Sequence, residues 1–390
     1  MATLLPCEII VDILCRLPVN DLLRYRSVSK SWRSLIDGRD FIKLHLNHSV
    51  KTSSNIGVIF GGRNDLCWVD LYDLKTAVRL PRPIDIGTEI NVIGGCNGLL
   101  ALINPKGDMD IWNPFTRRYI ILPISEHFHS FPFHVFEIVL TGFGHDPITD
   151  DYKLLLMINF RGIMVDSFHC EVKVYSLKAK TWKSIDHFPN HISYHRGNGV
   201  LFGDALHWVV YLKSDSSSLV FVFDVVTNDC REMGLPDYKG AQSCCMKLVD
   251  LRGCFCAAMV PNYDPEFKNS DQVDVWVMKE YGVKESWTTL FSVVPSNLTG
   301  AFNYVVPVAY LKDGDQVLLD QDGEKLLLYD MKRKRVKNTR VGSGFPTICD
   351  TLVCVPSLVG VDGGDYGEST WKKAGKNGKI KGKKQSGKKR

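Results

Sequence analysis

Several common targeting signals are missing from this 390-residue chain. No apolar run approaches the roughly 18–20 residues needed to span a bilayer, so we expect no transmembrane helix. Glu8 and Asp12 interrupt the first apolar stretch and no basic leader precedes it, which argues against a signal peptide. The twelve cysteines never form a CxxC pair, and most lie among Val, Leu and Phe, as buried free thiols do. A reduced cytosolic or nuclear setting is favoured over a disulfide framework.

Motifs of catalysis and cofactor binding are also missing. The chain has no Gly-rich phosphate loop of the GxxxxGK[ST] or GxGxxG type and no cysteine in a recognisable Cys/His nucleophile setting. Closely spaced cysteines are limited to Cys244-Cys245 and Cys254-x-Cys256, too few for the zinc ligands of a RING domain. We therefore expect no catalytic residue and no cofactor in this chain.

Two polar groups resemble metal sites at first sight. One is a set of histidines in a polar and aromatic segment without carboxylate or cysteine support, namely His127, His129 and His134. The other is a set of aspartates that suit turns between strands, namely Asp146, Asp150 and Asp151. We expect neither group to bind a metal.

The charge of the chain is unevenly distributed. The net charge is +5, yet residues 372–390 hold ten Lys or Arg and no acid, so the first 371 residues carry −5. Hydrophobic residues make up 45% of the chain, which is ample for a buried core. The folded body is therefore acidic, and its composition gives no reason to expect specific nucleic-acid binding.

The first 46 residues predict a small helical unit. Apolar residues from Ile9 to Leu17 follow helical spacing between Pro6 and Pro18, which predicts one amphipathic helix. Asn20 or Asp21 can cap a short second helix, and a third is predicted over about 27–36. Three short helices bury little by themselves, so something else should cover their apolar faces.

From about residue 55 to 359 the pattern changes to short apolar or alternating runs broken by Gly, Asn, Asp and Pro, which predicts β-structure. Within this region one repeat recurs, consisting of three mostly alternating residues, an aromatic, usually a short polar residue, and a turn. Its copies are Val69–Asp73, Met109–Asn113, Val172–Ser176, Val220–Asp224, Val273–Val277 and Leu326–Asp330. Further strands are predicted at 97–102, 198–201, 206–209, 253–259 and 317–319.

The repeat period favours a β-propeller over a β-sandwich. Residues 55–359 divide into six units of about 51, close to the roughly 40–50 residues of a four-stranded blade. We predict six blades, with seven as the alternative if strands at both ends build one more. The stretch from Ile124 to Glu137 is interpreted as a long loop of the second blade. Thr351–Val355 is predicted to pair with Ile56–Phe60 and close the ring, which hides edges prone to aggregation.

These patterns divide the chain into four parts: a helical unit at 1–46, a linker at 47–54, a propeller at 55–360 and a basic tail at 361–390. The tail lacks the apolar content needed for ordering, so we expect it to be disordered.

The helical unit resembles the F-box in its plant form. The matching residues are Leu5-Pro6-x-Glu8-Ile9, Ile13-Leu14-x-Arg16-Leu17-Pro18-Val19, Leu22-Leu23-Arg24-x-Arg26-x-Val28-Ser29-Lys30-x-Trp32, Leu35-Ile36, Phe41 and His45-Leu46. The β-region resembles the plant F-box-associated, kelch-related propeller. Its matching residues are Asn97-Gly98-Leu99, Trp112-Asn113-Pro114-x-Thr116-Arg117, Gly142-Phe143-Gly144-x-Asp146-Pro147-x-x-Asp150-Asp151-Tyr152-Lys153, Val172-x-Val174-Tyr175-Ser176-Leu177 with Trp182, and Val275-Trp276-x-Met278 with Trp287.

This resemblance implies a substrate receptor of a Skp1–cullin–F-box (SCF) ubiquitin ligase, with catalysis supplied by the cullin-bound RING subunit and its partners. The exposed apolar residues of an undersized helical unit agree with a partner that offers a groove. By position, the adaptor contacts would come from Leu5, Pro6, Ile9, Ile13, Leu14, Leu17, Pro18, Leu22, Val28 and Trp32. The competing interpretation is that some residues only pack the helices together, above all Ile13, Leu22 and Leu35.

Within the family, the chain resembles the constitutive-expresser-of-PR-genes type. The residues concerned are Tyr175-Ser176-Leu177-Lys178, Val273-Asp274-Val275-Trp276 and Met278-Lys279-Glu280-Tyr281. The implied substrates are nucleotide-binding leucine-rich-repeat immune receptors, which would make the protein a brake on plant defence. One alternative is an S-locus-type receptor for pollen-rejection ribonucleases. Another is a propeller enzyme or glycan-binding module, although no repeat-phased set of carboxylates or histidines supports it.

The basic tail has three interpretations: a nuclear import signal, a weak binder of nucleic acid or anionic lipid, and a solvated extension. The two basic clusters that favour import contain Lys381, Lys383, Lys384, Lys388, Lys389 and Arg390. The expected localisation is cytoplasmic and nuclear.

Overall fold

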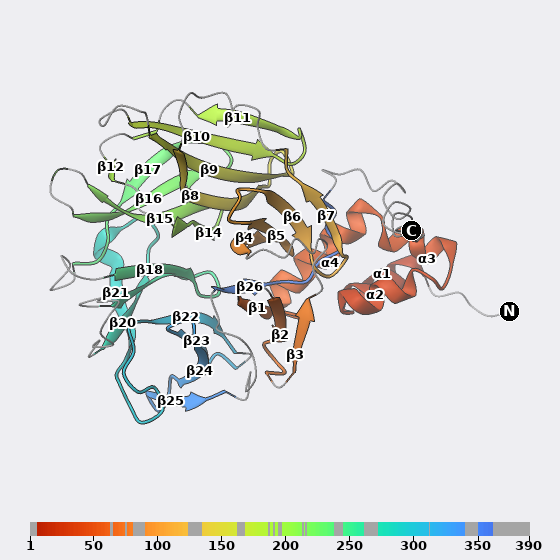
Figure 1. Ribbon diagram of the computed structural model, residues 1–390. Coiled ribbons are helices and arrows are strands. Elements are labelled where there is room, and N and C mark those ends of the chain that lie inside the picture. Colours follow the sequence, from red (N-terminus) through yellow and green to blue (C-terminus); the bar gives the residue numbers. More distant parts are fainter. Residues whose placement is uncertain are drawn as a thin grey trace, which may run out of the picture.

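Four helices come first in the structure, a computed structural model, and a ring of six β-sheets follows them (Figure 1). The structure describes residues 6–62, 65–74, 76–80, 90–123, 135–161, 168–185, 188–189, 192–193, 197–212, 214, 217–237, 245–260, 272–311, 313–339 and 350–361. The residues predicted as an import signal and the three histidines considered as metal ligands lie outside these ranges, as does Leu5.

The helices begin and end largely where prolines and polar caps require. Their bounds are Cys7–Cys15 for α1, Val19–Tyr25 for α2, Lys30–Ile36 for α3 and Arg39–Thr52 for α4. Pro6 and Pro18 stand at the N-caps of α1 and α2, where the missing N–H of proline costs nothing. The Ser29 hydroxyl accepts a hydrogen bond from the Trp32 N–H at 3.1 Å and caps α3.

Three details differ from the sequence prediction. The cap of α2 is Pro18, and no side chain caps it, so neither Asn20 nor Asp21 has the predicted role. The third helix begins at Lys30, because Ser29 is its cap. A fourth helix, α4, was not predicted, and it makes residues 47–52 of the predicted linker helical.

The six sheets are the predicted six blades. The strands of the first three sheets, in pairing order, are β26 (Asp350–Cys354), β1 (Gly57–Gly62), β2 (Asp65–Asp70) and β3 (Ala77–Leu80); β4 (Asn91–Cys96), β5 (Leu99–Ile103), β6 (Met109–Asn113) and β7 (Arg118–Ile121); and β8 (Val135–Asp146), β9 (Asp151–Arg161), β10 (Phe168–Ser176) and β11 (Thr181–Ile185), with β13 (Gly197–Asn198) parallel to β8.

The other three sheets follow the same plan. They are β14 (Val200–Phe202), β15 (Ala205–Leu212), β16 (Ser218–Asp224) and β17 (Cys230–Met233), with β12 (Ile192–Ser193) also on β15; β18 (Cys245–Asp250), β19 (Phe255–Val260), β20 (Val273–Met278) and β21 (Trp287–Val293), with the 3₁₀-helix Lys284–Ser286 before the last strand; and β22 (Val305–Tyr310), β23 (Gln316–Gln321), β24 (Lys325–Asp330) and β25 (Arg335–Asn338). All the additional strands predicted from sequence are present, with bounds that differ by a few residues.

The ring closes through its two ends, as predicted. β26 pairs antiparallel with β1, in a register that sets Leu352 opposite Ile59 and Val353 opposite Val58. The first sheet is therefore built from both ends of the propeller sequence, and β1 has no free edge.

The predicted repeat corresponds to the third strand of each sheet and the turn after it. In four sheets the residue after the aromatic caps this turn by accepting backbone N–H groups, namely Asn113, Ser176, Asp224 and Asp330. The first predicted copy, Val69–Asp73, is misaligned with the end of β2. There the capping residue is Asp70, which accepts the Tyr72 N–H, so Tyr72 lies in the turn beyond β2.

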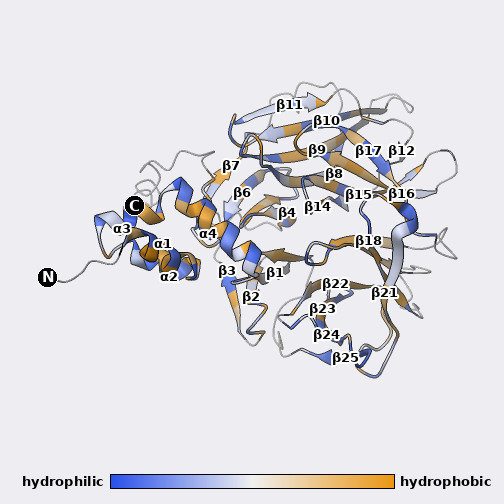
Figure 2. Ribbon diagram, turned by 180° about the vertical axis from the view of Figure 1, so that it is seen from behind, coloured by the Kyte–Doolittle hydropathy of each residue, from blue (hydrophilic) through white to orange (hydrophobic). Residues whose placement is uncertain are grey.

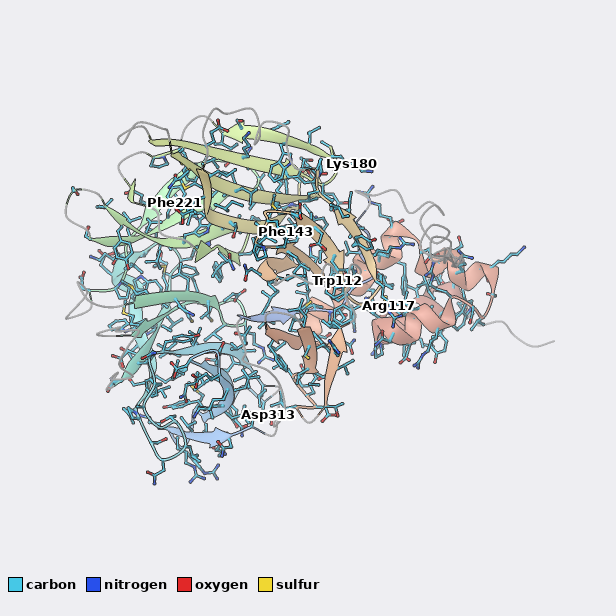
Figure 3. All side chains as sticks on the ribbon, viewed as in Figure 1. Trp112, Arg117, Phe143, Lys180, Phe221 and Asp313 are labelled. Atoms are coloured by element: carbon cyan, nitrogen blue, oxygen red, sulfur yellow. The ribbon has the colours of Figure 1, made fainter. Side chains whose placement is uncertain are left out.

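The hydrophobic core lies between neighbouring sheets. Five clusters of buried residues each join two adjacent sheets around the ring. Apolar residues accordingly concentrate on the strands in Figure 2. Trp112 and Phe221, both labelled in Figure 3, are fully buried members of these clusters. A sixth cluster joins the second and third sheets to the four helices.

The predicted insertion from Ile124 to Glu137 connects two blades. It runs from β7 of the second sheet to β8 of the third, and its last residues, 135–137, belong to β8. Residues 124–134 lie outside the described part of the chain.

One of the two faces of the ring lies toward the helices. Because successive strands are antiparallel, the turns between first and second strands and between third and fourth strands lie on one face. Arg117, Lys180 and Asp313 belong to such turns, and Figure 3 shows them on the side toward the helices. We call this the helix-side face and the opposite one the distal face.

Candidate partner-binding surfaces

The helices leave an apolar surface open to solvent. Ile9 is 46% exposed, Ile13 48% and Val28 60%, and Pro6 and Pro18 are exposed as well. Burying apolar surface contributes about 25 cal/mol per Å², so several such side chains exposed on so small a unit favour a partner. We call Pro6, Ile9, Ile13, Pro18, Val28 and Trp32 the open face.

Other predicted contact residues are buried inside the unit. Leu14 is 1% exposed and Leu22 0%, and both pack in the cluster that joins the helices to the ring. Leu17 and Leu35 are half-buried against the same cluster. Leu22 thus follows the competing interpretation, in which it packs the helices together, whereas Ile13 contradicts that interpretation because it faces solvent.

Trp32 is half-buried and forms part of an aromatic pair. Its ring meets that of Tyr25 edge to face, with centroids 6.0 Å apart. Tyr25 is itself 39% exposed and was not among the predicted contacts. Its place at the end of α2, within a turn of the exposed Val28, is the signal that could have identified it.

The covered side of the helices meets the body of the same chain. Residues Val355–Val361, which we call the strap, continue from β26, and Leu358, Val359 and Val361 are buried against the helices and the second sheet. In Figures 1 and 2, α4 lies between the other helices and the ring. The chain itself therefore covers one apolar side of the helical unit and leaves the open face uncovered.

Buried hydrogen bonds hold the strap in place. The Asn113 side-chain amide donates to the carbonyl oxygens of Ser357 at 3.0 Å and Val359 at 2.9 Å. The Ser357 hydroxyl donates to the Asn97 carbonyl oxygen at 2.5 Å. Gly98 has φ +82°, and a Cβ there would lie 2.4 Å from Ser357 Oγ, so a side chain at residue 98 would collide with the strap.

An ionic cluster ties α4 to the third sheet. Asp150, in the turn between β8 and β9, pairs with Arg39, with Lys43 Nζ at 2.8 Å and with His145 Nε2 at 3.1 Å. Partial burial by itself would raise the pKa of Asp150, but hydrogen bonds from Lys43, Arg39 and His145 hold it well below its usual range. The carboxylate therefore remains charged and anchors the helix.

The two other aspartates of this motif are turn residues, as expected. Asp146 accepts the N–H groups of Ile148 and Thr149, and Lys153 Nζ lies 3.0 Å away. Asp151 accepts the Lys178 N–H at 2.8 Å. In the described part of the chain, no group of three or more His, Cys, Asp or Glu side chains could hold a metal ion.

A chain of hydrogen bonds to the buried His207 explains the role of Tyr281 in the motif Met278–Tyr281. The Tyr281 hydroxyl donates to His207 Nε2 at 2.6 Å and accepts from Arg231 at 2.8 Å, while His207 Nδ1 lies 3.2 Å from the Val200 carbonyl oxygen. Burial lowers the pKa of His207 to about 4, so the ring is neutral and accepts from Tyr281. This motif joins the fourth and fifth sheets.

The nine cysteines whose state the structure describes are free thiols. Burial raises the pKa of Cys96, Cys256 and Cys354 to about 12, which makes these thiols poor nucleophiles. Over the described residues, no helix is both long and apolar enough for a membrane span.

A channel runs through the centre of the ring. Its cavity has a volume of about 1240 Å³ and is lined mainly by the first strands of the sheets. Ser53 and Val50, at the end of α4, line its helix-side end. The channel and the open face are both surfaces that the described residues offer to partners.

Comparison with known proteins places these features in a family. A model of the F-box-associated β-propeller domain matches residues 69–361, and an F-box domain model matches residues 3–44. The F-box protein CPR1 of Arabidopsis thaliana is 34% identical over 92% of this chain and 89% of its own length. An F-box/kelch-repeat protein of the same plant is 30% identical over 81% of this chain and 85% of its own.

Solved structures are more distant. An oligogalacturonate lyase in complex with manganese covers 74% of both chains at 11% sequence identity and a TM-score of 0.41, a level that supports no argument about activity. The two domain models together match most of the sequence, and the relatives align over most of their length. The chain therefore belongs to the family of F-box proteins that carry an F-box-associated β-propeller domain.

Proposed function

We propose that this protein is the substrate-recognition subunit of an SCF ubiquitin ligase. The observation that carries the proposal is the open face of the helices, an exposed apolar surface on a unit whose other side is already covered by the strap and the ring. An adaptor of the Skp1 type, which links the F-box to cullin and the RING subunit, is the partner that fits this surface.

We assign the predicted contact residues two roles according to their burial. The residues of the open face supply the contact, together with Leu5, whose side chain lies outside the described residues. Leu14 and Leu22 keep the helices on the ring, because both are buried in the shared core. Leu17 is half-buried and borders both groups.

The role of the propeller is to position a target protein. Other subunits supply the chemistry, and a target held near an activated ubiquitin reacts at a raised effective concentration. The shared core, the strap and the ion pairs of Asp150 fix the helices relative to the ring, so a bound target has a defined place relative to the ligase core.

We further propose that the targets are nucleotide-binding leucine-rich-repeat immune receptors, so that the protein restrains plant defence in the cytoplasm and nucleus. The support is the similarity to the constitutive-expresser-of-PR-genes type at three motifs and to CPR1 over 92% of the chain. The basic clusters at 381–390 would then act in nuclear import.

Co-expression with a Skp1-type adaptor tests the adaptor interface. The double variant Ile9→Ser with Ile13→Ser should lose co-purification, because two exposed apolar contacts are removed while the fold keeps its core. The matched control is Val78→Ser, since Val78 is 53% exposed but lies on β3 of the ring. Undiminished binding by the double variant would refute the assignment of the open face.

Affinity purification tests the target class. The double variant should retain targets without passing them to the ligase, so immune receptors should accumulate on it relative to the intact chain. Quantitative mass spectrometry under proteasome inhibition provides the measurement. If no receptor of this class is enriched on either protein, the target assignment is wrong, whatever the outcome for the adaptor.

A further inference from the structure

The central channel contains a lysine with an unusual setting. The first strands of the sheets surround the centre of the ring (Figure 1), and the cavity between them is largely walled by apolar residues. These include Val92, Val249, Val306, Val308 and Val353. Lys247, in the middle of β18, lines the same cavity.

The alternation of β18 turns Lys247 away from the fourth sheet. Met246 and Leu248 are buried in the cluster between the fourth and fifth sheets, so the residue between them points the other way. The Lys247 ammonium lies over the Tyr304 ring, 3.9 Å from its centroid. This cation–π contact limits the directions that the lysine can take and keeps its charge beside the aromatic ring.

Lys247 has no counter-ion among the described residues. Asp320, another charged residue of the lining, accepts hydrogen bonds from the Gly323 N–H at 3.0 Å and the Thr351 hydroxyl at 3.1 Å. Asp250, the last residue of β18, accepts the Gly253 N–H at 2.7 Å. A positive charge oriented by an aromatic ring in an apolar wall is therefore available to an anion.

The position of Lys247 assigns the site to the distal half of the channel. β18 begins at the distal face and ends at the turn 251–254 on the helix-side face, and Tyr304 directly precedes β22 at the distal end. The end of α4 lines the opposite end of the cavity. A partner that approaches from the distal face meets Tyr304 and Lys247 first.

We propose that the distal mouth of the channel binds an acidic side chain of the target protein, with Lys247 as its counter-ion and Tyr304 as its positioning residue. The inference rests on the proposed function, because it supplies the recognition chemistry of a target receptor. The cavity volume of about 1240 Å³ exceeds the roughly 300–1000 Å³ typical of small-molecule pockets, which favours an inserted polypeptide segment as the occupant.

Selection of random dodecapeptides by phage display tests the charge preference. The bait is the full chain in complex with its Skp1-type adaptor. We expect the intact protein to enrich peptides containing Asp or Glu, and Lys247→Glu to enrich Lys or Arg in their place. The control is Lys180→Glu, because Lys180 is an exposed residue in a turn of the helix-side face. Equal enrichment by the intact protein and Lys247→Glu, or none by either, would overturn the proposal.

Fluorescence anisotropy with the most enriched acidic peptide gives the magnitude. Lys247→Ala and the peptide's own Asp or Glu to Asn or Gln change should each weaken binding about tenfold or more, and combining the two should add little further loss. Lys247→Arg should retain most of the affinity. If the losses of affinity from Lys247→Ala and from the neutralised peptide add independently, the acidic group of the peptide does not contact Lys247.

A phosphorylated version of the peptide distinguishes the anion. Tighter binding of a phosphoserine at the acidic position, abolished in Lys247→Glu, would replace the carboxylate by a phosphate and contradict the proposal as stated. Co-purification of the adaptor with every Lys247 variant separates the two levels. If the adaptor does not co-purify with the intact chain, the proposed function is contradicted. If the adaptor co-purifies but acidic peptides are not enriched, only the proposed site at Lys247 is contradicted.

Discussion

The helical unit and the ring differ in how much of their apolar surface they bury. Each sheet of the ring is covered by its neighbours, and the pairing of β26 with β1 removes the free edge of the opening strand. Exposed apolar residues of the ring, such as Val78, Ile121 and Ile148, are spread over different strands and turns. The helices instead leave Ile9 and Ile13 exposed one turn apart on α1. The ring therefore buries most of its apolar side chains against its own sheets and the helices, whereas the helical unit leaves part of its apolar surface exposed.

The two regions nevertheless depend on each other. The cluster that contains Leu14 and Leu22 also contains residues of the second sheet and the strap. A helical unit of about 45 residues is marginal when alone, so its stability should follow that of the ring. The comparison is thus between a region that supplies its own core and one that shares it.

Removal of β26 and the strap should have the largest effect. Deleting residues 350–390 exposes the edge of β1 and the seat of the helices, so we expect loss of soluble, cooperatively folding protein. Deleting only residues 362–390 is the control and should leave the melting temperature within about 2 °C of the intact chain. Circular dichroism and soluble yield measure both outcomes. A stable protein without residues 350–390 would show that ring closure is dispensable.

Two neighbouring residues of α1 should differ sharply. Leu14→Ala removes a side chain that is 1% exposed and should cost about 2–4 kcal/mol of unfolding free energy. Ile13→Ala alters a side chain that is 48% exposed and should cost less than about 0.5 kcal/mol. Urea denaturation of the full chain measures both. Similar costs for the two variants would contradict the described orientation of α1.

The ion pairs of Asp150 should give a smaller, pH-dependent effect. The folded pKa of Asp150 lies below the unfolded value of about 3.9, so the carboxylate contributes stability above that unfolded value. This contribution is lost as the pH falls from the unfolded value through the lower folded pKa. Asp150→Asn should therefore destabilise the chain at pH 7 by about 1 kcal/mol, and the difference should shrink below about pH 4. Thermal unfolding across this range measures it. A pH-independent difference would assign the effect to packing.

Much of the ring could be predicted because its sequence signal is local and repeated. A strand with mostly alternating apolar residues and an aromatic before a turn recurs along the sequence, in four sheets with a capping side chain after the aromatic, and the spacing of the copies predicts the number of sheets. The frame failed in the first copy because Asp70 and Asp73 both fit the polar position. The neighbouring Tyr72 favoured the wrong one.

The helical unit was predicted less completely. The spacing of Phe41, Ile42, His45 and Leu46 is helical, so α4 could have been found from the sequence. The orientation of α1 could not, because Ile13 and Leu14 are adjacent and both fit an apolar stripe. The contact with the ring decides which of them is buried.

The sequence by itself determined the helices, the strand repeat, the number of blades and the separation of an acidic body from a basic tail, because these follow from residue types within short windows. The tertiary structure decided the rest. Asp150 meets Lys43, Asn113 holds the strap at Ser357, and Lys247 stands over Tyr304 with no carboxylate partner among the residues that the structure describes. These pairs are separated by 57 residues or more, and no local pattern of charge or hydropathy records which distant residues the closed ring brings together.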